Sequence, residues 1–322
     1  TTFGTVPKQI NRADLFNYVE SELLASETDL KAPKTNEYGR LDKAAAWTLL
    51  ARLYLNATVY NGSNRNSDVI KYCEKVIAAG YSLKEKKITI PDPNDPTKTI
   101  EKNIGYESLF LTDNNVNNPE NIFSVVYDGT YTQTNGGTTF LVHAAIGGSM
   151  NPLELGVNGG WGGLRVTKNF VNRFTDTNDK RGNFYTQGQS LEINDLGDFK
   201  NGYAFIKYKN VTSTGVSGSD KSGVFVDTDL PLYRLSDVYL MYAEATLRGG
   251  NGSLSTALGY INALKTRAGA ATISSSDLTL NFILDERSRE LSWEFTRRTD
   301  LIRFGLFTSS TYLWPWKGGV KD

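Results

Sequence analysis

The chain has 322 residues and a net charge of zero, with 35 Lys and Arg against 35 Asp and Glu. This balance lacks the basic footprint that binding to a phosphate backbone requires, so the composition argues against a nucleic-acid partner. The single Cys excludes an internal disulfide or a cysteine metal cluster, and the single His restricts any His-dependent catalytic site to His143.

We expect neither a signal peptide at the start of the chain nor a membrane-spanning segment within it. No segment approaches the roughly 18 consecutive apolar residues that a membrane-spanning helix needs. The first residues have neither the basic nor the apolar part of a signal peptide. A helical pattern begins almost at once, at Lys8, and no terminating element follows the Trp-Pro-Trp sequence at 314–316. We therefore expect a fragment of a longer protein.

The first third of the chain has helical periodicity. Asn11 is a plausible N-cap for a helix whose apolar face is Leu15, Phe16, Val19 and Leu23. A second helical face runs from Ala46 to Ala57, and a third helix opens near Ser67 and ends before Gly80, a residue suited to a C-cap. Cys73 lies on the apolar stripe of the third helix and is predicted to be a buried, unreactive thiol.

Residues 83–230 lack a sustained hydrophobic period. They begin with a Pro-rich break at 91–96 and contain short strand-like runs at 122–127, 203–211 and 223–226. Glycine clusters separate these runs, the largest being the Gly-Gly-Trp-Gly-Gly sequence at 159–163. We interpret this region as loops and short strands inserted between helices, and such loops are where binding residues usually lie.

The last third repeats the helical pattern of the first. An apolar face runs from Leu235 to Thr246, a turn of glycines follows at 249–252, and a second face runs from Ala257 to Ala268. Two helix–turn–helix pairs of about 34 residues, with small residues on the first helix of each, favour tetratricopeptide-type hairpins. The predicted fold is therefore mainly α, with helical hairpins cradling a loop-rich region.

The densest charged segment runs from Asp285 to Arg303. Glu286 and Glu290 could act as the carboxylate pair of a glycosidase. The alternative is an ion-paired helix, with pairs Asp285–Arg289, Glu294–Arg298 and Asp300–Arg303. Nearby arginines would keep both carboxylates ionised, whereas a general acid needs a raised pKa, so we favour the ion-paired helix.

The sequence predicts no cofactor. His143 lies in an apolar loop without other His or Cys nearby, which favours a ligand-contacting or hydrogen-bonded imidazole over a metal site. The glycine clusters match neither the dinucleotide nor the P-loop pattern. Asp176, Asn178 and Asp179 could offer oxygens to a structural calcium ion, but the spacing of a calcium loop is missing.

Aromatic residues fall into a helical set and a loop set. The helical set is expected to pack in the core and comprises Trp47, Tyr54, Tyr239, Tyr242 and Trp293. The loop set comprises Tyr131, Phe140, Trp161, Trp314 and Trp316. Sugar rings stack their apolar face on aromatic rings while polar side chains bind the hydroxyls, and Asn158, Trp161 and Arg165 offer that combination within eight residues. For each loop aromatic, the alternative is a ring that packs back into the hydrophobic core.

Several motifs resemble the SusD/RagB family. They are Leu41-Asp42-Lys43-Ala44-Ala45-Ala46-Trp47, the segment from Leu232 to Ala245 with the sequence LYRLSDVYLMYAEA, Lys265-Thr266-Arg267-Ala268-Gly269, and the run from Ile283 through Arg298-Thr299-Asp300-Leu301-Ile302-Arg303-Phe304-Gly305. They occur in order over nearly the whole chain. The Trp-Pro-Trp ending is similar to the starch-utilisation branch.

The resemblance implies one partial SusD-like domain over residues 1–322. Its helical hairpins would cover 8–82 and 231–310, and the inserted ligand-binding region would cover 83–230. It further implies a non-catalytic, lipid-anchored outer-membrane protein, exposed at the cell surface, that binds oligo- or polysaccharide for a TonB-dependent, SusC-like transporter. Starch or malto-oligosaccharide is the expected ligand. The chemistry and the loop location of the residues, rather than the resemblance, predict that it is bound by Trp161, Tyr131, Phe140, Asn158 and Arg165. A glycoside hydrolase and a transporter-associated scaffold without its own sugar site are the alternatives.

Overall fold

The computed structural model describes the chain except residues 1–3, 5–7, 310–311 and 313–322. Trp314 and Trp316, predicted as loop aromatics, lie outside the described residues. The elements in chain order are α1 (Arg12–Ser26), α2 (Lys43–Leu55), α3 (Ala57–Tyr60), α4 (Asn66–Ala78), β1 (Lys87–Asp92), β2 (Asp95–Asn103), η1 (Glu107–Phe110), β3 (Asn121–Val125), α5 (Gly137–Ala144), η2 (Pro152–Leu155), α6 (Lys168–Val171), β4 (Phe184–Tyr185), β5 (Ala204–Phe205), β6 (Leu230–Arg234), α7 (Leu235–Leu247), α8 (Leu254–Arg267), α9 (Leu280–Glu290) and α10 (Arg297–Arg303).

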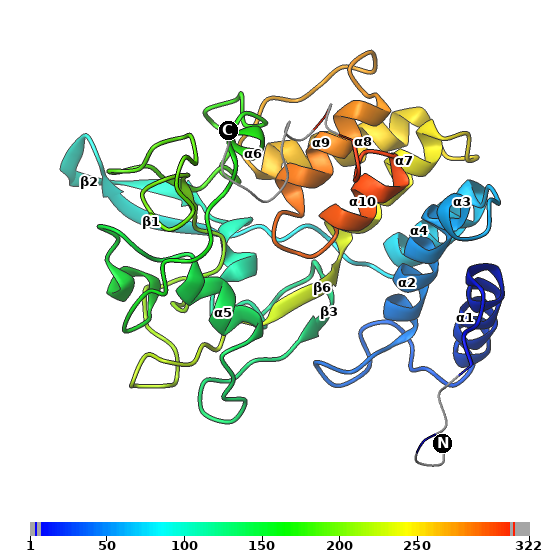
Figure 1. The fold of residues 1–322 in the computed structure, drawn as a ribbon, viewed down its shortest axis with the longest axis horizontal. Helices are drawn as coiled ribbons and strands as arrows, with labels where there is room; N and C mark the ends of the chain where they lie inside the picture. Colours follow the sequence, from blue (N-terminus) through cyan, green and yellow to red (C-terminus); the bar gives the residue numbers. More distant parts are fainter. Residues whose placement is uncertain (1–3, 5–7, 310–311, 313–322) are drawn as a thin grey trace.

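The helices form one side of the molecule, and the mainly α prediction is confirmed. Helices α1–α4 and α7–α10 gather on the right of Figure 1, and the loop-rich part with α5, α6 and the β1–β2 hairpin lies on the left. Helix α4 packs against both α2 and α7, and α7 packs against α8. Small residues on the first helix of each hairpin allow this close approach, because Ala51 of α2 and Ala243 of α7 are fully buried.

Local signals placed these helices correctly. Asn11 caps α1 by accepting a hydrogen bond from the amide of Asp14, and Gly80 ends the turn after α4 at a φ of 81°. Cys73 is buried, as predicted, and burial raises the pKa of its thiol. The predicted apolar face of α1 is wrong at Leu15, which is exposed, whereas Phe16 is buried. Val19 and Leu23 are half-buried, and Leu23 packs against the helical core.

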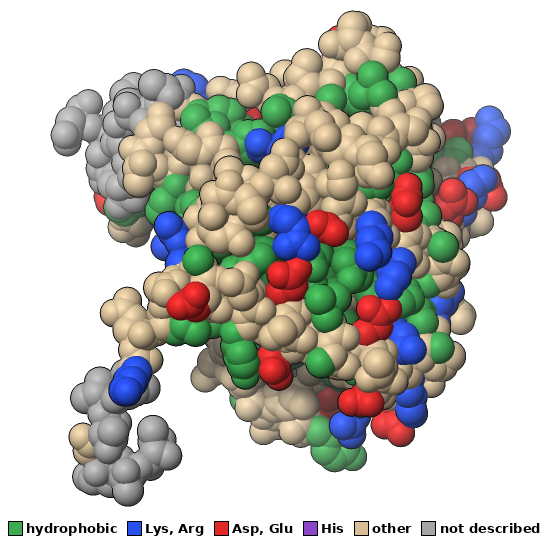
Figure 2. All heavy atoms as spheres, turned by 90° about the vertical axis from the view of Figure 1, so that its right-hand side faces the viewer, with side chains coloured by type: hydrophobic (Ala, Val, Ile, Leu, Met, Phe, Trp, Pro, Cys, Tyr) green, Lys and Arg blue, Asp and Glu red, His purple; other side chains and the backbone are tan. Residues whose placement is uncertain are grey.

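The face formed by the helices carries charges of both signs. Figure 2 looks at the right-hand side of Figure 1 and shows Lys, Arg, Asp and Glu side chains interspersed with apolar ones. Among the residues that the structure describes, no helix is both long enough and apolar enough to cross a membrane.

The loop-rich part differs from the sequence prediction in its details. The Pro-rich break at 91–96 contains the turn of the β1–β2 hairpin, at residues 93–94, and the two strands pair antiparallel. Strand β3 forms near its predicted place and pairs with β6, but the run at 203–211 contributes only the two residues of β5. Residues 223–226 form no strand. His143 lies on the short helix α5 rather than in a loop.

This part nevertheless has a hydrophobic core of its own, which the lack of a sustained period did not predict. Its centre is a cluster of buried residues that includes Leu109, Phe110, Val142, Ile146 and Tyr208. The chain reaches this core from many short segments, so no single segment shows a long apolar pattern. The division of the chain at 83 and 230 stays a prediction.

The charged segment from Asp285 to Arg303 forms two helices instead of one. The chain leaves the helical path after Glu290, where Trp293 and Phe295 adopt left-handed φ values of 58° and 63°. The predicted helical placement of Trp293 is therefore wrong. Asp285 pairs with Arg173 and Glu294 with Arg234, so of the three predicted pairs only Asp300–Arg303 forms.

Candidate functional site

The candidate site is built on the carboxyl end of α5. Helix ends leave carbonyl groups without partners in the helix. Here the amide of Trp161 donates to the carbonyl of His143 at 2.8 Å, and the amide of Gly163 donates to that of Ala144 at 2.9 Å. Gly160 is required sterically, since a Cβ there would lie 2.3 Å from the carbonyl oxygen of Ile146. The glycine-rich loop is therefore a fixed cap on α5.

Trp161 lies flat on a buried histidine. The rings of Trp161 and His143 are stacked, with centroids 4.9 Å apart and planes at 15°. Phe140, one helical turn before His143, has its ring 6.1 Å from that of Trp161. Trp161 is 47% exposed and Phe140 is 43% exposed, so the two rings present a surface to solvent. Neither the Trp161 ring nor the Phe140 ring is packed into the core.

The imidazole of His143 is held from both sides. Its Nδ1 lies 2.7 Å from the carbonyl oxygen of Gly159, and its Nε2 lies 2.8 Å from that of Val224. Each ring nitrogen therefore lies within hydrogen-bonding distance of a backbone carbonyl oxygen. The ring thereby ties the Trp161 loop to the segment around Val224. The hydrogen-bonded interpretation of His143 is confirmed.

Two aspartates shape the neighbouring loop at 218–227. Hydrogen bonds from the amides of Phe225, Ser222 and Val224 hold the pKa of Asp220 at about 2. Asp227 accepts from the amide of Gly129 at 2.6 Å. These contacts bring the loop before α5 next to the 218–227 loop.

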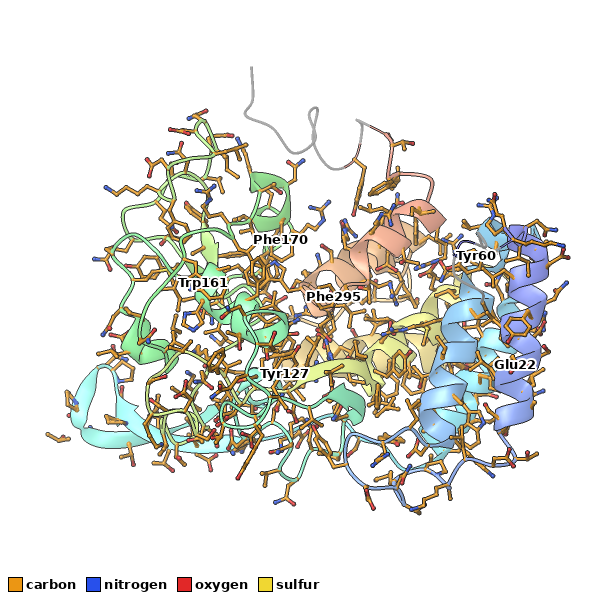
Figure 3. The ribbon with its side chains drawn as sticks, turned by 60° about the horizontal axis from the view of Figure 1, so that its bottom comes forward. Glu22, Tyr60, Tyr127, Trp161, Phe170 and Phe295 are labelled. Carbon is orange, nitrogen blue, oxygen red and sulfur yellow. The ribbon has the colours of Figure 1, made fainter. Side chains whose placement is uncertain are left out.

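Tyr131 and Asn158 belong to these same loops. Tyr131 follows the tether at Gly129 and is 86% exposed. The side-chain amide of Asn158 donates to the carbonyl of Ser222 at 2.8 Å. Figure 3 shows Trp161 in this loop-rich part, above Tyr127. The structure therefore brings Trp161 and Phe140 together, with Asn158 bonded to the 218–227 loop and Tyr131 on an adjoining loop.

Arg165 makes different contacts. Its guanidinium donates to the carbonyls of Asp198 at 2.7 Å and Leu196 at 2.9 Å and lies over the ring of Phe199. These bonds direct the charge toward the 195–199 loop, which Arg165 holds in place. The contribution of Arg165 to ligand binding stays a prediction.

Glu286 and Glu290 belong to a buried ion-pair network. Both side chains are inaccessible to solvent, and Arg181 donates to each of them. Burial alone would raise the pKa of both carboxyls. At Glu286, however, Arg181 and Arg289 lower the pKa. At Glu290, Arg267, Arg234 and Arg181 lower it. A glycosidase acid needs a raised pKa and contact with substrate, and this pair has neither.

The oxygens near Asp176 have partners within the protein. Asp179 pairs with Arg181 at 2.7 Å, and Asp176 accepts from the amides of Asn178 and Ala271. Within the part of the chain that the structure describes, no three or more His, Cys, Asp or Glu side chains gather as a metal site. The prediction that the chain needs no cofactor stays a prediction.

Sequence reasoning missed two parts of the site. The stacking of His143 under Trp161 joins residues 18 positions apart and depends on how the glycine loop folds back on α5. The loop at 218–227 carried a recognisable signal, since an Asp two residues before a Ser is typical of a side-chain-capped turn. Nothing in the sequence placed that turn beside Asn158.

The chain was compared with known proteins. Residues 194–321 match the model of the SusD family. The starch-binding protein SusD of Bacteroides thetaiotaomicron is 30% identical over 366 residues, which cover 98% of this chain and 61% of that protein. The solved structure of surface glycan-binding protein A from the same organism is 25% identical with a TM-score of 0.64, and covers 97% of this chain and 64% of that one.

A structure of that second protein in complex with laminarihexaose superposes on this chain with a TM-score of 0.63 at 24% identity, covering 97% of this chain and 64% of that one. The chain spans less than two thirds of the length of each of these relatives.

Proposed function

The resemblance to the SusD/RagB family is confirmed in sequence and in fold, and on this premise we propose that the chain is a non-catalytic glycan-binding protein. Its ligand is an oligo- or polysaccharide, with starch or malto-oligosaccharide as the first candidate. The name of the 30% identical relative, a starch-binding protein, supports that candidate.

The observation that carries the proposal is the half-exposed Trp161 on its fixed support. A sugar ring stacks on a flat aromatic face, and binding costs less when that face is already held in place. His143 holds one face of the Trp161 ring, while Phe140 lies beside it and extends the apolar surface. Tyr131 and Asn158 are the further contacts that we propose.

A catalytic alternative has little support in the structure. The only carboxylate pair that the sequence suggested, Glu286 and Glu290, is buried and ion-paired. A hydrolase would release product from a soluble glycan and lose this activity on Glu286→Gln or Glu290→Gln. We expect no product from the unaltered protein.

The partner and the location follow from the family resemblance. We propose that the protein is lipid-anchored at the outer surface of the outer membrane and delivers glycan to a SusC-like, TonB-dependent transporter. A scaffold that binds the transporter but no sugar is the second candidate. Co-purification of the transporter, together with no binding to any glycan on an array, would favour the scaffold.

The direct test is isothermal titration of maltoheptaose against the protein and three variants. Trp161→Ala should weaken binding about tenfold, the value of one good ring contact. Tyr131→Ala should weaken binding to a smaller extent, because its ring lacks a stacked support. Tyr18→Ala removes an exposed ring on α1 and serves as the control. Equal affinities for the Trp161 variant and the unaltered protein would rule out this surface, and no binding to any glycan of a broad panel would rule out the function.

A further inference from the structure

A cavity of about 240 Å³ lies on the helical side of the molecule, between α1–α3 and α10. Leu49 and Leu53 of α2 and Tyr60 of α3 form an apolar wall, and Arg52 and Asp300 provide charged groups. Phe295, in the turn between α9 and α10, completes the lining. None of these residues belongs to the segments around Trp161. Figure 3 shows Phe295 beside the α9–α10 segment and Tyr60 on the neighbouring pale blue helices.

Phe295 occupies a backbone position that suits glycine. Its φ of 63° lies in the left-handed region, where a bulky side chain is strained and glycine is not. The ring gives little packing in return, because it is 66% exposed. Within the described part of the chain it makes no aromatic or cation–π contact. Strain that the protein retains without a packing gain points to a function for the ring.

Asp300 supplies a second, independent observation. Its side chain is buried, and its Oδ1 accepts from Arg287 and Arg303. Its Oδ2 is also buried but has no hydrogen-bond partner among the described residues. An unpaired buried acceptor is costly, and such an atom in the lining of a cavity is suited to a donor from a ligand.

The charges of the lining select the kind of ligand. Arg52 uses Nε for Asp237 and Nη2 for the carbonyl of Leu232, which leaves Nη1 available as a donor. Asp300 offers an acceptor, and the exposed Thr299 hydroxyl can do either. Arg287 and Arg303 also line the cavity, but their charges are paired with Asp237, Glu244 and Asp300. A charged ligand of either sign would meet a like charge, whereas a hydroxyl group can both donate and accept. The apolar wall and the Phe295 ring suit the C–H face of a sugar.

We propose that this cavity is a second binding site, which takes one sugar ring of a neutral carbohydrate stacked on Phe295. The volume is below the roughly 300–1,000 Å³ of sites for drug-sized ligands, so one ring enters and the rest of the glycan stays outside. The inference deepens the proposed function and rests on it, since both sites bind neutral glycan.

The test is a titration of the protein, labelled with ¹³C at its leucine methyl groups, with maltotriose, followed by NMR. The methyl groups of Leu49 and Leu53 report on the cavity, and those of Leu141 and Leu164 report on the surface around Trp161. Both sets should shift. In Phe295→Gly, the affinity read from Leu49 and Leu53 should fall about tenfold while that read from the other set is unchanged. Trp161→Ala should show the reverse.

Two controls separate loss of the ring from damage to the fold. Phe295→Gly suits the left-handed backbone, so its melting temperature should not fall. Phe307→Ala removes an exposed ring outside the cavity and should change neither set of shifts. Shifts confined to Leu141 and Leu164 would overturn the second site and leave the proposed function standing. Leu49 and Leu53 shifts that survive in Phe295→Gly would overturn the role of the ring. The absence of all shifts would overturn malto-oligosaccharide as the ligand of both sites.

Discussion

Glu290→Gln removes one charge from the centre of the buried ion-pair network and keeps the shape of the side chain. Glu290 accepts hydrogen bonds from three arginines, Arg181, Arg234 and Arg267. The connected network contains five carboxylates and five cations, which are Asp179, Glu120, Glu286, Glu290 and Glu294 with Arg181, Lys207, Arg234, Arg267 and Arg289. The substitution leaves a net charge of +1 where almost no water can reach it.

The expected loss of stability follows from that imbalance. Removing one partner from a buried ion pair costs about 3–5 kcal/mol, because the remaining charge is uncompensated. A domain has a total stability of about 5–15 kcal/mol, so the variant loses about a fifth of it or more. The matched control is Glu101→Gln on the exposed strand β2, where Glu101 pairs with Lys87 on the surface, and its expected change is within about 0.5 kcal/mol.

Equilibrium unfolding in urea, followed by tryptophan fluorescence, measures both values. Maltoheptaose affinity of the folded Glu290→Gln variant should equal that of the unaltered protein, since Glu290 is remote from the exposed rings. A loss of stability below about 1 kcal/mol would refute the electrostatic reasoning. A large loss of binding in a fully folded variant would refute the purely structural role of the network.

Three further predictions concern single features. Cys73 should react with Ellman's reagent only after unfolding, because its thiol is buried and its pKa is raised; rapid reaction of the native protein would contradict this. His143→Ala should weaken maltoheptaose binding about as much as Trp161→Ala, measured by calorimetry, because it removes the support of the Trp161 ring; full affinity in a folded variant would show that the support is dispensable. Burial alone would raise the pKa of Glu244, but Arg303 holds it at about 2, so stability should be full above pH 4.5 and fall toward pH 2; Glu244→Gln should flatten this decline in urea titrations, and an unchanged slope would contradict it.

Local patterns were enough to place the ends of the helices in the first third of the chain. The helix start at Asn11 and the stop at Gly80 depend on neighbours within one turn, so the sequence was sufficient to predict them. The burial of Cys73 followed from helical periodicity alone. The same reasoning failed for Leu15, because periodicity tells which residues share a face and not whether another element covers that face.

Ion pairing could not be predicted from spacing. Arg289 pairs with Glu286 rather than Asp285, and Glu294 is held by Arg234 from a strand 60 positions away. Side chains three or four residues apart on a helix can form ion pairs. The partners of a buried carboxylate, however, are the cations that the tertiary fold places next to it. The helix breaks after Glu290, but the left-handed positions there are occupied by Trp293 and Phe295 instead of glycine, so the sequence did not predict the break.

The sequence by itself determined the helical hairpins, the loop-rich middle of the chain and the kinds of residue that could bind a sugar. Periodicity, capping and composition are local properties, and short-range physics is enough to interpret them. Only the tertiary structure decided that Trp161 stacks on His143 while Arg165 is held by a neighbouring loop. It also decided that Glu286 and Glu290 are sealed in an ion-pair network and that Phe295 faces a cavity. These outcomes depend on contacts between distant segments, because burial and orientation are set by what packs against a residue.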